Sequence, residues 1–297
     1  MSRIVEVGQF ADNISMLFAD ADAAWLKQES FSHLAPRFIT PDGKMVISFQ
    51  AFVVQTPSRR LMVDTCIGND RQRKYGVFTN LRTDFLADLH AIGCPADSID
   101  TVLCTHLHFD HTGWNTMQVN GKWGPTFPNA RYLFARREFE HIQHLRAQAD
   151  EHAEHYEDSI APIVAARLVD LVDADHRVCP EIWLEPTPGH TPAHVSIRIQ
   201  SRGADAIITG DIMHHPVQCA VPDKQVNFDE DKPLACRTRR EFLGRYDSRR
   251  ALVIGSHFAE PTAGWIEASG ETWRFEAQED ATRCSADGCT TNWEKRA

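Results

Sequence analysis

The sequence predicts an α/β sandwich, a fold in which β-sheets pack face to face with helices on their outer sides. Short apolar runs bounded by turn residues, typical of strands, recur along the chain, and after the first third they alternate with segments of helical spacing. No repeat of fixed period, low-complexity segment or Gly/Ser linker divides the 297 residues. We therefore expect a single domain over residues 1–297.

Composition and charge limit the class of protein. The chain is 42% hydrophobic and 24% charged, its mean hydropathy is -0.36, and no apolar run approaches the roughly 20 residues that span a bilayer. The segment Met1–Val7 has no apolar stretch of signal-peptide length, so we expect a soluble, cytoplasmic protein without a membrane partner. The net charge of -10 argues against nucleic acid and favours a small-molecule substrate. The oligomeric state is open, with a homodimer as one option.

The first part of the chain contains strand patterns that lead to a histidine-rich run. Alternating or apolar runs predict strands at 4–7, 14–18, 45–54 and 61–64. Helical spacing predicts a helix at 83–92, which Gly93 and Pro95 end. The apolar run 99–104 then predicts a buried strand that continues directly into the histidines.

Strand and helix patterns alternate in the later part. We expect a strand at 131–134, helices at 136–149 and 160–172, and strands at 182–184, 195–199, 206–209 and 252–254. Three of the last four strands run into a segment in which a glycine lies one or two residues before His190, Asp211 or His257. Glycine permits the tight turn that lets a side chain at a strand end project over the sheet edge.

Four potential metal ligands lie within six residues: His106, His108, Asp110 and His111. In an extended segment His106 and His108 point the same way, because side chains alternate, so both can reach one ion. Asp110 and His111 follow where the chain turns and can face a second ion. Imidazole and carboxylate without thiolate suit catalytic zinc, or iron or manganese. One run cannot complete two centres, so His190, Asp211 and His257 are the candidates for the remaining ligands.

With these motifs the sequence resembles the metallo-β-lactamase superfamily, whose H-x-H-x-D-H motif is matched in full. The resemblance extends from Val63-Asp64-Thr65 to Gly255-Ser256-His257. It implies an αββα sandwich with two zinc ions at one edge of the sheets and Asp64 supporting the site. The implied ligands are His106, His108 and His190 for one ion, Asp110, His111 and His257 for the other, and Asp211 as the bridge.

Within the superfamily the residues resemble the lactonase branch, which includes N-acyl-homoserine lactonases, 4-pyridoxolactonase and the methyl parathion hydrolase group. An acid at position 108 would indicate di-iron members and a cysteine at 211 the true β-lactamases, but the chain has His108 and Asp211. The basic face of a nuclease is not visible. Many homoserine lactonases carry a tyrosine three residues after the bridging aspartate, where this chain has His214 followed by His215.

The resulting hypothesis is a dinuclear zinc hydrolase that opens a lactone or cleaves a carboxylic ester by attack of a metal-bridging hydroxide. Asp110, Asp211 and either His214 or His215 are expected to take part, the histidine by donating a hydrogen bond to the developing oxyanion. The alternatives are a hydrolase of a phosphotriester, a thioester or a β-lactam amide, and an inactive metal-binding module.

Other notable residues have structural interpretations. His194 is expected to be a buried, hydrogen-bonded histidine, and His141, His144, His152 and His155 to lie on a solvated helix face. Core packing is the default for Trp25, Phe109 and Trp114, although they could line an apolar pocket. The cysteines are expected to be reduced structural thiols, with a Cys284–Cys289 disulfide or metal site left open.

Overall fold

The computed structural model describes residues 1–248 and 250–278. Contacts within the chain group these residues into two compact units. Among the described residues, the first unit contains Met1–Val7 and Phe49–Asp173, and the second contains Gly8–Ser48, 174–248 and 250–278. Each unit has its own buried core, and the single domain over residues 1–297 stays a prediction.

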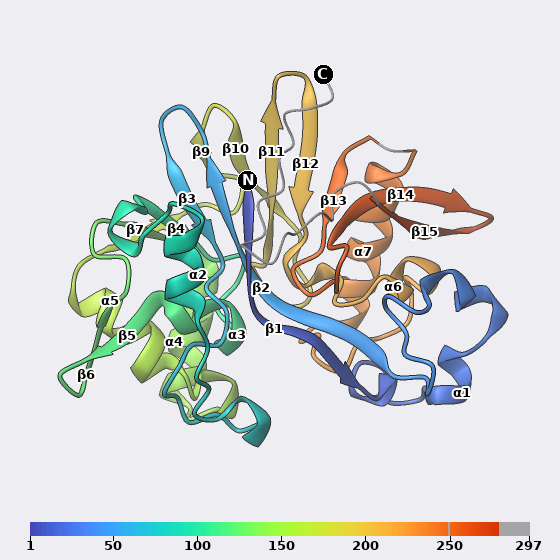
Figure 1. Ribbon diagram of the computed structural model, residues 1–297, viewed down its shortest axis with the longest axis horizontal. Coiled ribbons are helices and arrows are strands. Elements are labelled where there is room, and N and C mark those ends of the chain that lie inside the picture. Colours follow the sequence, from blue (N-terminus) through green and yellow to red (C-terminus); the bar gives the residue numbers. More distant parts are fainter. Residues whose placement is uncertain (249, 279–297) are drawn as a thin grey trace. The chain divides into compact units, whose positions relative to one another are not determined.

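The main sheet of the first unit has six strands in the order β1-β2-β3-β4-β7-β8 (Figure 1). Strands β3, β4, β7 and β8 run parallel, and β2 pairs antiparallel with β3. Strands β1 and β2 also contribute residues to the second unit. A separate hairpin joins β5 and β6. The strands are β1 (Ser2–Asp12), β2 (Met45–Gln55), β3 (Arg60–Val63), β4 (Thr101–Leu103), β5 (Thr116–Val119), β6 (Lys122–Pro125), β7 (Arg131–Ala135) and β8 (Val169–Val172).

Helices of the first unit pack on its parallel strands. Helix α4 lies beside β7 and β8. Buried side chains of β4 and β7, such as Val102 and Tyr132, share a core with Phe85 and Leu89 of α2. The helices are α2 (Phe85–Ala91), α3 (Phe109–Thr112), α4 (Arg136–Ala147) and α5 (Ala161–Ala165), with the short helices η3 (Gly76–Phe78), η4 (Ala96–Ser98), η5 (Gly113–Asn115), η6 (Glu151–Ala153) and the π-helix η7 (Tyr156–Ile160).

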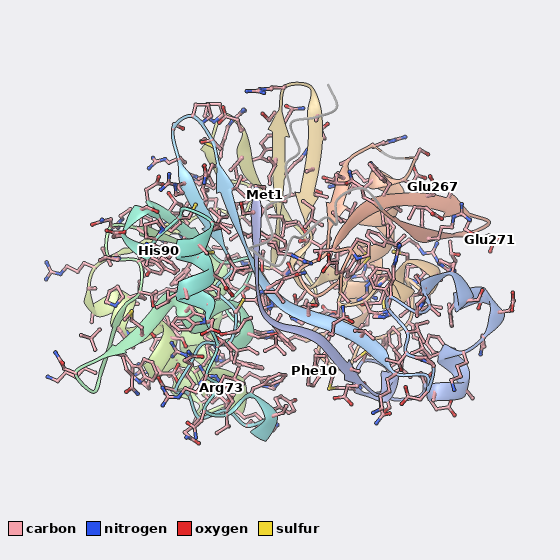
Figure 2. The ribbon with its side chains drawn as sticks, in the orientation of Figure 1. Met1, Phe10, Arg73, His90, Glu267 and Glu271 are labelled. Atoms are coloured by element: carbon pink, nitrogen blue, oxygen red, sulfur yellow. The ribbon has the colours of Figure 1, made fainter. Side chains whose placement is uncertain are left out.

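The second unit contains a seven-stranded sheet in the order β15-β14-β13-β12-β11-β10-β9. Strands β12 and β13 are parallel and the other neighbours antiparallel. In the β14–β15 hairpin, Glu267, labelled in Figure 2, lies opposite Arg274 and pairs with it at 3.3 Å, as opposite charges across strands commonly do. The strands are β9 (Arg177–Cys179), β10 (Ile182–Pro186), β11 (Val195–Ser201), β12 (Ala204–Ile208), β13 (Leu252–Ile254), β14 (Ala263–Ser269) and β15 (Thr272–Ala277).

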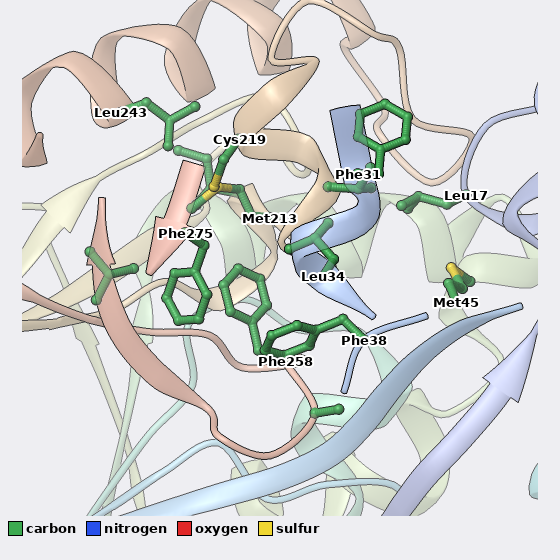
Figure 3. Close-up of a cluster of buried hydrophobic side chains, with 14 of the residues drawn as sticks. Leu17, Phe31, Leu34, Phe38, Met45, Met213, Cys219, Leu243, Phe258 and Phe275 are labelled. Atoms are coloured by element: carbon green, nitrogen blue, oxygen red, sulfur yellow. The ribbon is translucent and has the colours of Figure 1, made fainter. Parts of the chain in front are cut away.

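Aromatic packing organises the core of the second unit. Figure 3 shows Phe38, Phe258 and Phe275 together, and the Phe275 ring lies edge-on to the other two at 6.0 and 5.0 Å between ring centroids. Phe242 and Leu243 of α7 enter the same cluster. The helices are α1 (Ala23–Leu26), α6 (Val217–Ala220), α7 (Lys232–Tyr246), η1 (Ile14–Met16), η2 (Glu29–Leu34) and η8 (Gly210–Ile212).

Most strands expected from the sequence are present, but two expectations were wrong. Residues 14–18 contain the 3-10 helix η1 instead of a strand, because the buried Ile14, Leu17 and Phe18 follow helical spacing of three and four residues. The helix expected at 160–172 ends early: α5 stops at Ala165, Arg167 has a positive φ of 59°, and the chain continues as β8. Helix α7 and the β14–β15 and β5–β6 hairpins were not anticipated.

Within residues 1–248 and 250–278, no helix is both long and apolar enough to cross a membrane.

Candidate metal centre

In the first unit, the loop after β4 carries the run of ligands from His106 to His111. His108 is in extended conformation at the start of α3, and its Nδ1 lies 3.1 Å from Nε2 of His106. The two rings thus point to the same place, as expected from alternation along an extended segment. Asp110 and His111 lie in the first turn of α3, with 3.8 Å between Asp110 Oδ2 and His111 Nε2.

Each of two buried histidines in this loop has its Nδ1 held by a neighbouring oxygen. His111 Nδ1 lies 2.8 Å from Oδ2 of Asp64, and His106 Nδ1 lies 3.1 Å from Oγ of Thr105. Asp64, buried and at a positive φ of 55°, also accepts a hydrogen bond from the Thr105 backbone. These contacts leave Nε2 of His106 and His111 as the atom suited to a metal, and they match the supporting role expected for Asp64.

The peptide groups of Leu107, between His106 and His108, are held by two buried side chains. Glu138 of α4 accepts a hydrogen bond from the Leu107 nitrogen at 3.3 Å, and His155 Nε2 lies 2.7 Å from the Leu107 oxygen. Burial lowers the pKa of His155 to about 4, so this imidazole is neutral at pH 7 and donates to the carbonyl. The loop is therefore fixed from outside the ligand motif.

Glu6 of β1 connects the loop after β3 to the segment after α3. Its carboxylate accepts hydrogen bonds from the backbone of Ile67 and Gly68, from the Trp114 indole at 2.6 Å and from the Thr83 hydroxyl. Burial raises the pKa of Glu6, although these four donors oppose that rise. Nothing in the sequence near Glu6 indicated this role.

In the second unit, ligand candidates follow three strands. His190 follows β10, Asp211 lies in η8 after β12, and His257 follows β13. The preceding glycines at 189 and 210 have positive φ values of 133° and 56°, as tight turns require. Gly255 is required for a different reason. A Cβ there would lie 2.1 Å from the Phe258 ring, so only glycine lets the backbone pass this close to the ring.

Three histidine nitrogens face the buried carboxylate of Asp211. Nε2 of His190 and Nε2 of His214 lie 3.5 and 3.2 Å from Oδ2, and Nε2 of His257 lies 3.2 Å from Oδ1. The two carboxylate oxygens therefore face different histidines. This is the arrangement that a carboxylate bridging two ions needs.

Two of these histidines are also held at their other ring nitrogen. His257 Nδ1 lies 3.0 Å from the Ser48 carbonyl, and His190 Nδ1 lies 3.1 Å from Oδ1 of Asp229, a buried residue that the sequence did not single out. Burial raises the pKa of Asp229, but the hydrogen bond and charge of His190 and the charge of Arg239 outweigh it and lower the pKa overall.

The donor set of the second unit fits a divalent metal ion. Ligand atoms of His190, Asp211 and His214 all lie within 4.8 Å of one another, and all three residues are buried. Two imidazole nitrogens together with a carboxylate are typical of catalytic metal sites, and the opposite nitrogen of His190 is hydrogen-bonded, as metal-binding histidines usually are.

The two histidines after Asp211 have different environments. His215 is fully buried, with Nε2 2.8 Å from the Phe38 carbonyl and Nδ1 accepting a hydrogen bond from the Val217 nitrogen. Both of its ring nitrogens are thus occupied by backbone. His214 Nε2 faces Asp211, and among the described residues its buried Nδ1 has no hydrogen-bond partner.

The remaining singled-out residues are mostly structural. His194 is buried, with Nε2 accepting from the Asp211 nitrogen at 2.8 Å and Nδ1 3.0 Å from the Thr187 carbonyl, as expected. Within the described ranges, His141, His144, His152 and His155 do not gather into a metal-binding group, and His155 is buried instead of solvated. The structural residues are Trp25, which packs on Phe18 and Phe31, and Trp114, which stacks on Phe85.

The cysteines agree with the sequence-based expectation as far as they are described. Cys66, Cys94, Cys104, Cys179, Cys219 and Cys236 are free and buried. Cys284 and Cys289 lie outside the described residues.

Comparison with known proteins identifies the family of this chain. Residues 50–248 match the model of the metallo-β-lactamase superfamily. N-acyl homoserine lactonases of a Bacillus species and of Bacillus thuringiensis subsp. kurstaki are each 22% identical over 210 residues, which cover 66% of this chain and 73% of theirs.

Solved structures show the same fold. A hydrolase of the β-lactamase superfamily, AbOPH, aligns with a TM-score of 0.75 at 20% identity, and the dizinc quorum-quenching lactonase AidC aligns with 0.72 at 22% identity. Each alignment covers 92% of both chains.

The chain belongs to the metallo-β-lactamase superfamily, because the family match covers more than half of it. It is a metal-dependent hydrolase with the α/β sandwich fold expected from the sequence.

Proposed function

We propose that this protein is a dinuclear zinc hydrolase that opens a lactone or cleaves a carboxylic ester. The supporting observation is the Asp211 carboxylate, whose two oxygens face Nε2 atoms of different histidines. A carboxylate in this position can bridge two ions. The proposed ligands are His106, His108 and His190 for one ion, Asp110, His111 and His257 for the other, with Asp211 shared.

Zinc, when bound, lowers the pKa of a water ligand to about 7 and polarises the substrate carbonyl. Other side chains of the protein orient the proposed ligands. Asp64 and Asp229 hold their histidines through Nδ1, which directs Nε2 to the metal side. His194 holds the backbone of Asp211.

We assign oxyanion stabilisation to His214 and no longer to His215. The backbone contacts of His215 leave its ring no nitrogen for a substrate. His214 lies beside Asp211, and its backbone nitrogen is held by Oε1 of Gln218 at 2.7 Å. A fixed imidazole there can donate a hydrogen bond to oxygen that gains charge during acyl transfer.

An apolar surface adjoins the ligand loop in the first unit. Phe109, between two ligand residues, lies 5.9 Å from Phe78 and 6.4 Å from Tyr75 between ring centroids. Tyr75 is 45% exposed and Val77 is 59% exposed, so this side of the loop presents apolar side chains to solvent. The surface favours a substrate with an apolar part, and the lactonases among the relatives favour a lactone.

The test is a metal analysis joined to a turnover screen. Protein purified without chelator is expected to contain about two zinc ions per chain, because seven oxygen and nitrogen ligands exceed what one tetrahedral zinc uses. Zinc-loaded protein is then assayed with lactones, aryl esters, thioesters and organophosphates. Highest kcat/KM on a lactone or ester supports the proposal. A preference for a thioester or an organophosphate would show that the substrate is not a lactone or carboxylic ester. Unchanged turnover after exhaustive chelation would contradict the whole proposal.

A further inference from the structure

We propose that Asp229 and Arg239 are positioning residues that hold His190 and the Asp211 loop in their metal-binding geometry. This inference rests on the proposed function, because it takes His190 and Asp211 to be metal ligands. The four residues all lie in the second unit.

Asp229 is placed to orient one ligand and to receive one cation. Its Oδ1 lies 3.1 Å from Nδ1 of His190, and its Oδ2 accepts a hydrogen bond from the Arg239 guanidinium at 2.9 Å. The side chains of Asp229 and Arg239 are both completely buried. A carboxylate on the far nitrogen of a histidine fixes the ring and raises the basicity of the nitrogen that faces the metal.

Arg239 connects this pair to the loop that carries Asp211. Its Nε donates to the carbonyl of Ile212, the residue after Asp211, at 2.8 Å. Its Nη1 donates to the carbonyls of Pro222 and Lys224 at 3.0 and 3.2 Å. The planar guanidinium has several N–H donors in fixed directions and can make these contacts together, whereas the ammonium group of a lysine cannot. Arg239 thus contacts the Asp211 loop directly, through Ile212, and the ligand His190 indirectly, through Asp229.

Backbone contacts bring Asp229 to His190. The nitrogen of Glu230 donates to the His190 carbonyl at 3.1 Å, and that of Asp231 donates to the Gly189 carbonyl at 3.0 Å. Asp231 also caps α7 by accepting from the Leu234 nitrogen. Because a Cβ on Gly189 would lie 2.4 Å from the backbone of α7, the helix that carries Arg239 packs directly on the ligand loop.

Stability alone is a weak explanation for this arrangement. Removing two charges from water costs several kcal/mol per ion, and a buried pair is often no more stabilising than apolar residues of similar volume. His257 shows a simpler way to hold a ligand, since its Nδ1 lies 3.0 Å from the neutral backbone carbonyl of Ser48. A buried ion pair directed at a ligand is better explained by fixing that ligand in one orientation.

The experiment measures zinc affinity by competition with a chelator and thermal stability of the metal-free protein. Asp229→Asn is expected to weaken the affinity by about 10 to 100-fold, the usual cost of losing a group that orients a ligand. The matched control is Glu185→Gln. Glu185 is also a buried carboxylate of the second unit and accepts hydrogen bonds from Arg245 and Tyr246, none of which is a proposed ligand. The control should lower thermal stability and keep zinc affinity within about twofold.

A second variant covers the case in which Asp229→Asn does not fold. Arg239→Lys keeps the charge near Asp229 but loses the hydrogen bond to Ile212, so it is expected to weaken zinc binding and to change the visible spectrum of the cobalt-substituted protein. A merely structural role would lower stability and leave that spectrum unchanged.

The outcomes separate this inference from the proposed function. If wild type binds two ions but Asp229→Asn binds them equally well, or weakens binding no more than Glu185→Gln does, the positioning role is overturned and the hydrolase proposal stands. If wild type binds no zinc, or His190→Ala binds as tightly as wild type, the proposed ligand set itself fails.

Discussion

The two units present their proposed ligands in different ways. In the first unit four ligands lie in one loop and the first turn of α3, so their spacing in the chain nearly fixes their spacing in space. In the second unit the ligands follow three different strands, and their geometry depends on the parallel pairing of β12 with β13 and on the packing of α7.

The supporting groups come from distant parts of the chain in both units. Asp64, in the turn after β3, orients His111 from 47 residues away along the chain. Asp229 orients His190 from 39 residues away, and the difference is that Asp229 is itself held by a buried cation, Arg239 of α7. The ligand run in one loop and the ligands spread over three strands thus both depend on buried groups that only the folded chain brings together.

The largest effect should come from the residue that contacts the most ligands in the second unit. Asp211→Ala is expected to lower kcat/KM by more than about 10²-fold and to reduce bound metal, because the loss of a bridging ligand should exceed that of an orienting group. His194→Ala should be less damaging, since it removes a hydrogen bond to the Asp211 backbone and no proposed ligand. Steady-state kinetics with metal analysis decides this, and equal, small losses would show that the bridge is misplaced.

A smaller effect is expected for the histidines after Asp211. His214→Ala should lower kcat by about 10² to 10³-fold with metal content unchanged, the usual cost of one oxyanion donor. His215→Ala should lower thermal stability and leave kcat of the folded enzyme nearly normal, because both ring nitrogens contact backbone. Unchanged kcat in His214→Ala would remove its proposed role, and loss of metal would make it a ligand instead.

The smallest effect concerns a buried histidine in each unit. Burial lowers the pKa of His155 and of His215 to about 4 from 6.5, so the unfolded chain takes up their protons first as the pH falls. Their contribution to stability is present above pH 6.5 and is lost between pH 6.5 and 4. Each of the two histidines should account for about 2 kcal/mol of the free energy of unfolding that is lost between pH 7 and pH 5. This follows because a pKa shift of one unit corresponds to about 1.36 kcal/mol.

Denaturant unfolding of the metal-free protein at pH 7 and pH 5 measures this loss. His155→Gln should lower stability at pH 7 but make it less dependent on pH. His90→Gln, at an exposed position of α2, is the control and should keep the wild-type dependence. If His155→Gln also keeps the wild-type pH dependence of stability, His155 is not buried in its neutral form.

The sequence by itself determined the candidate ligand residues and the class of fold. The run from His106 to His111 and the glycines before His190 and Asp211 could be recognised because local spacing and turn geometry carry that information. Asp64 was found from the resemblance of the Val63-Asp64-Thr65 turn to the superfamily. The strands that lead into the ligands were found because buried strands have a strong apolar pattern.

Tertiary structure alone decided the supporting contacts and the choice between His214 and His215. Glu6, Asp229 and Arg239 have no distinctive local pattern, because what marks each is burial opposite groups that are far away in sequence. His214 and His215 are identical neighbours in the sequence, and they differ only in what the fold places against each ring, a proposed metal ligand or backbone. Hydrogen bonding and burial depend on that packing, which short-range sequence patterns do not encode.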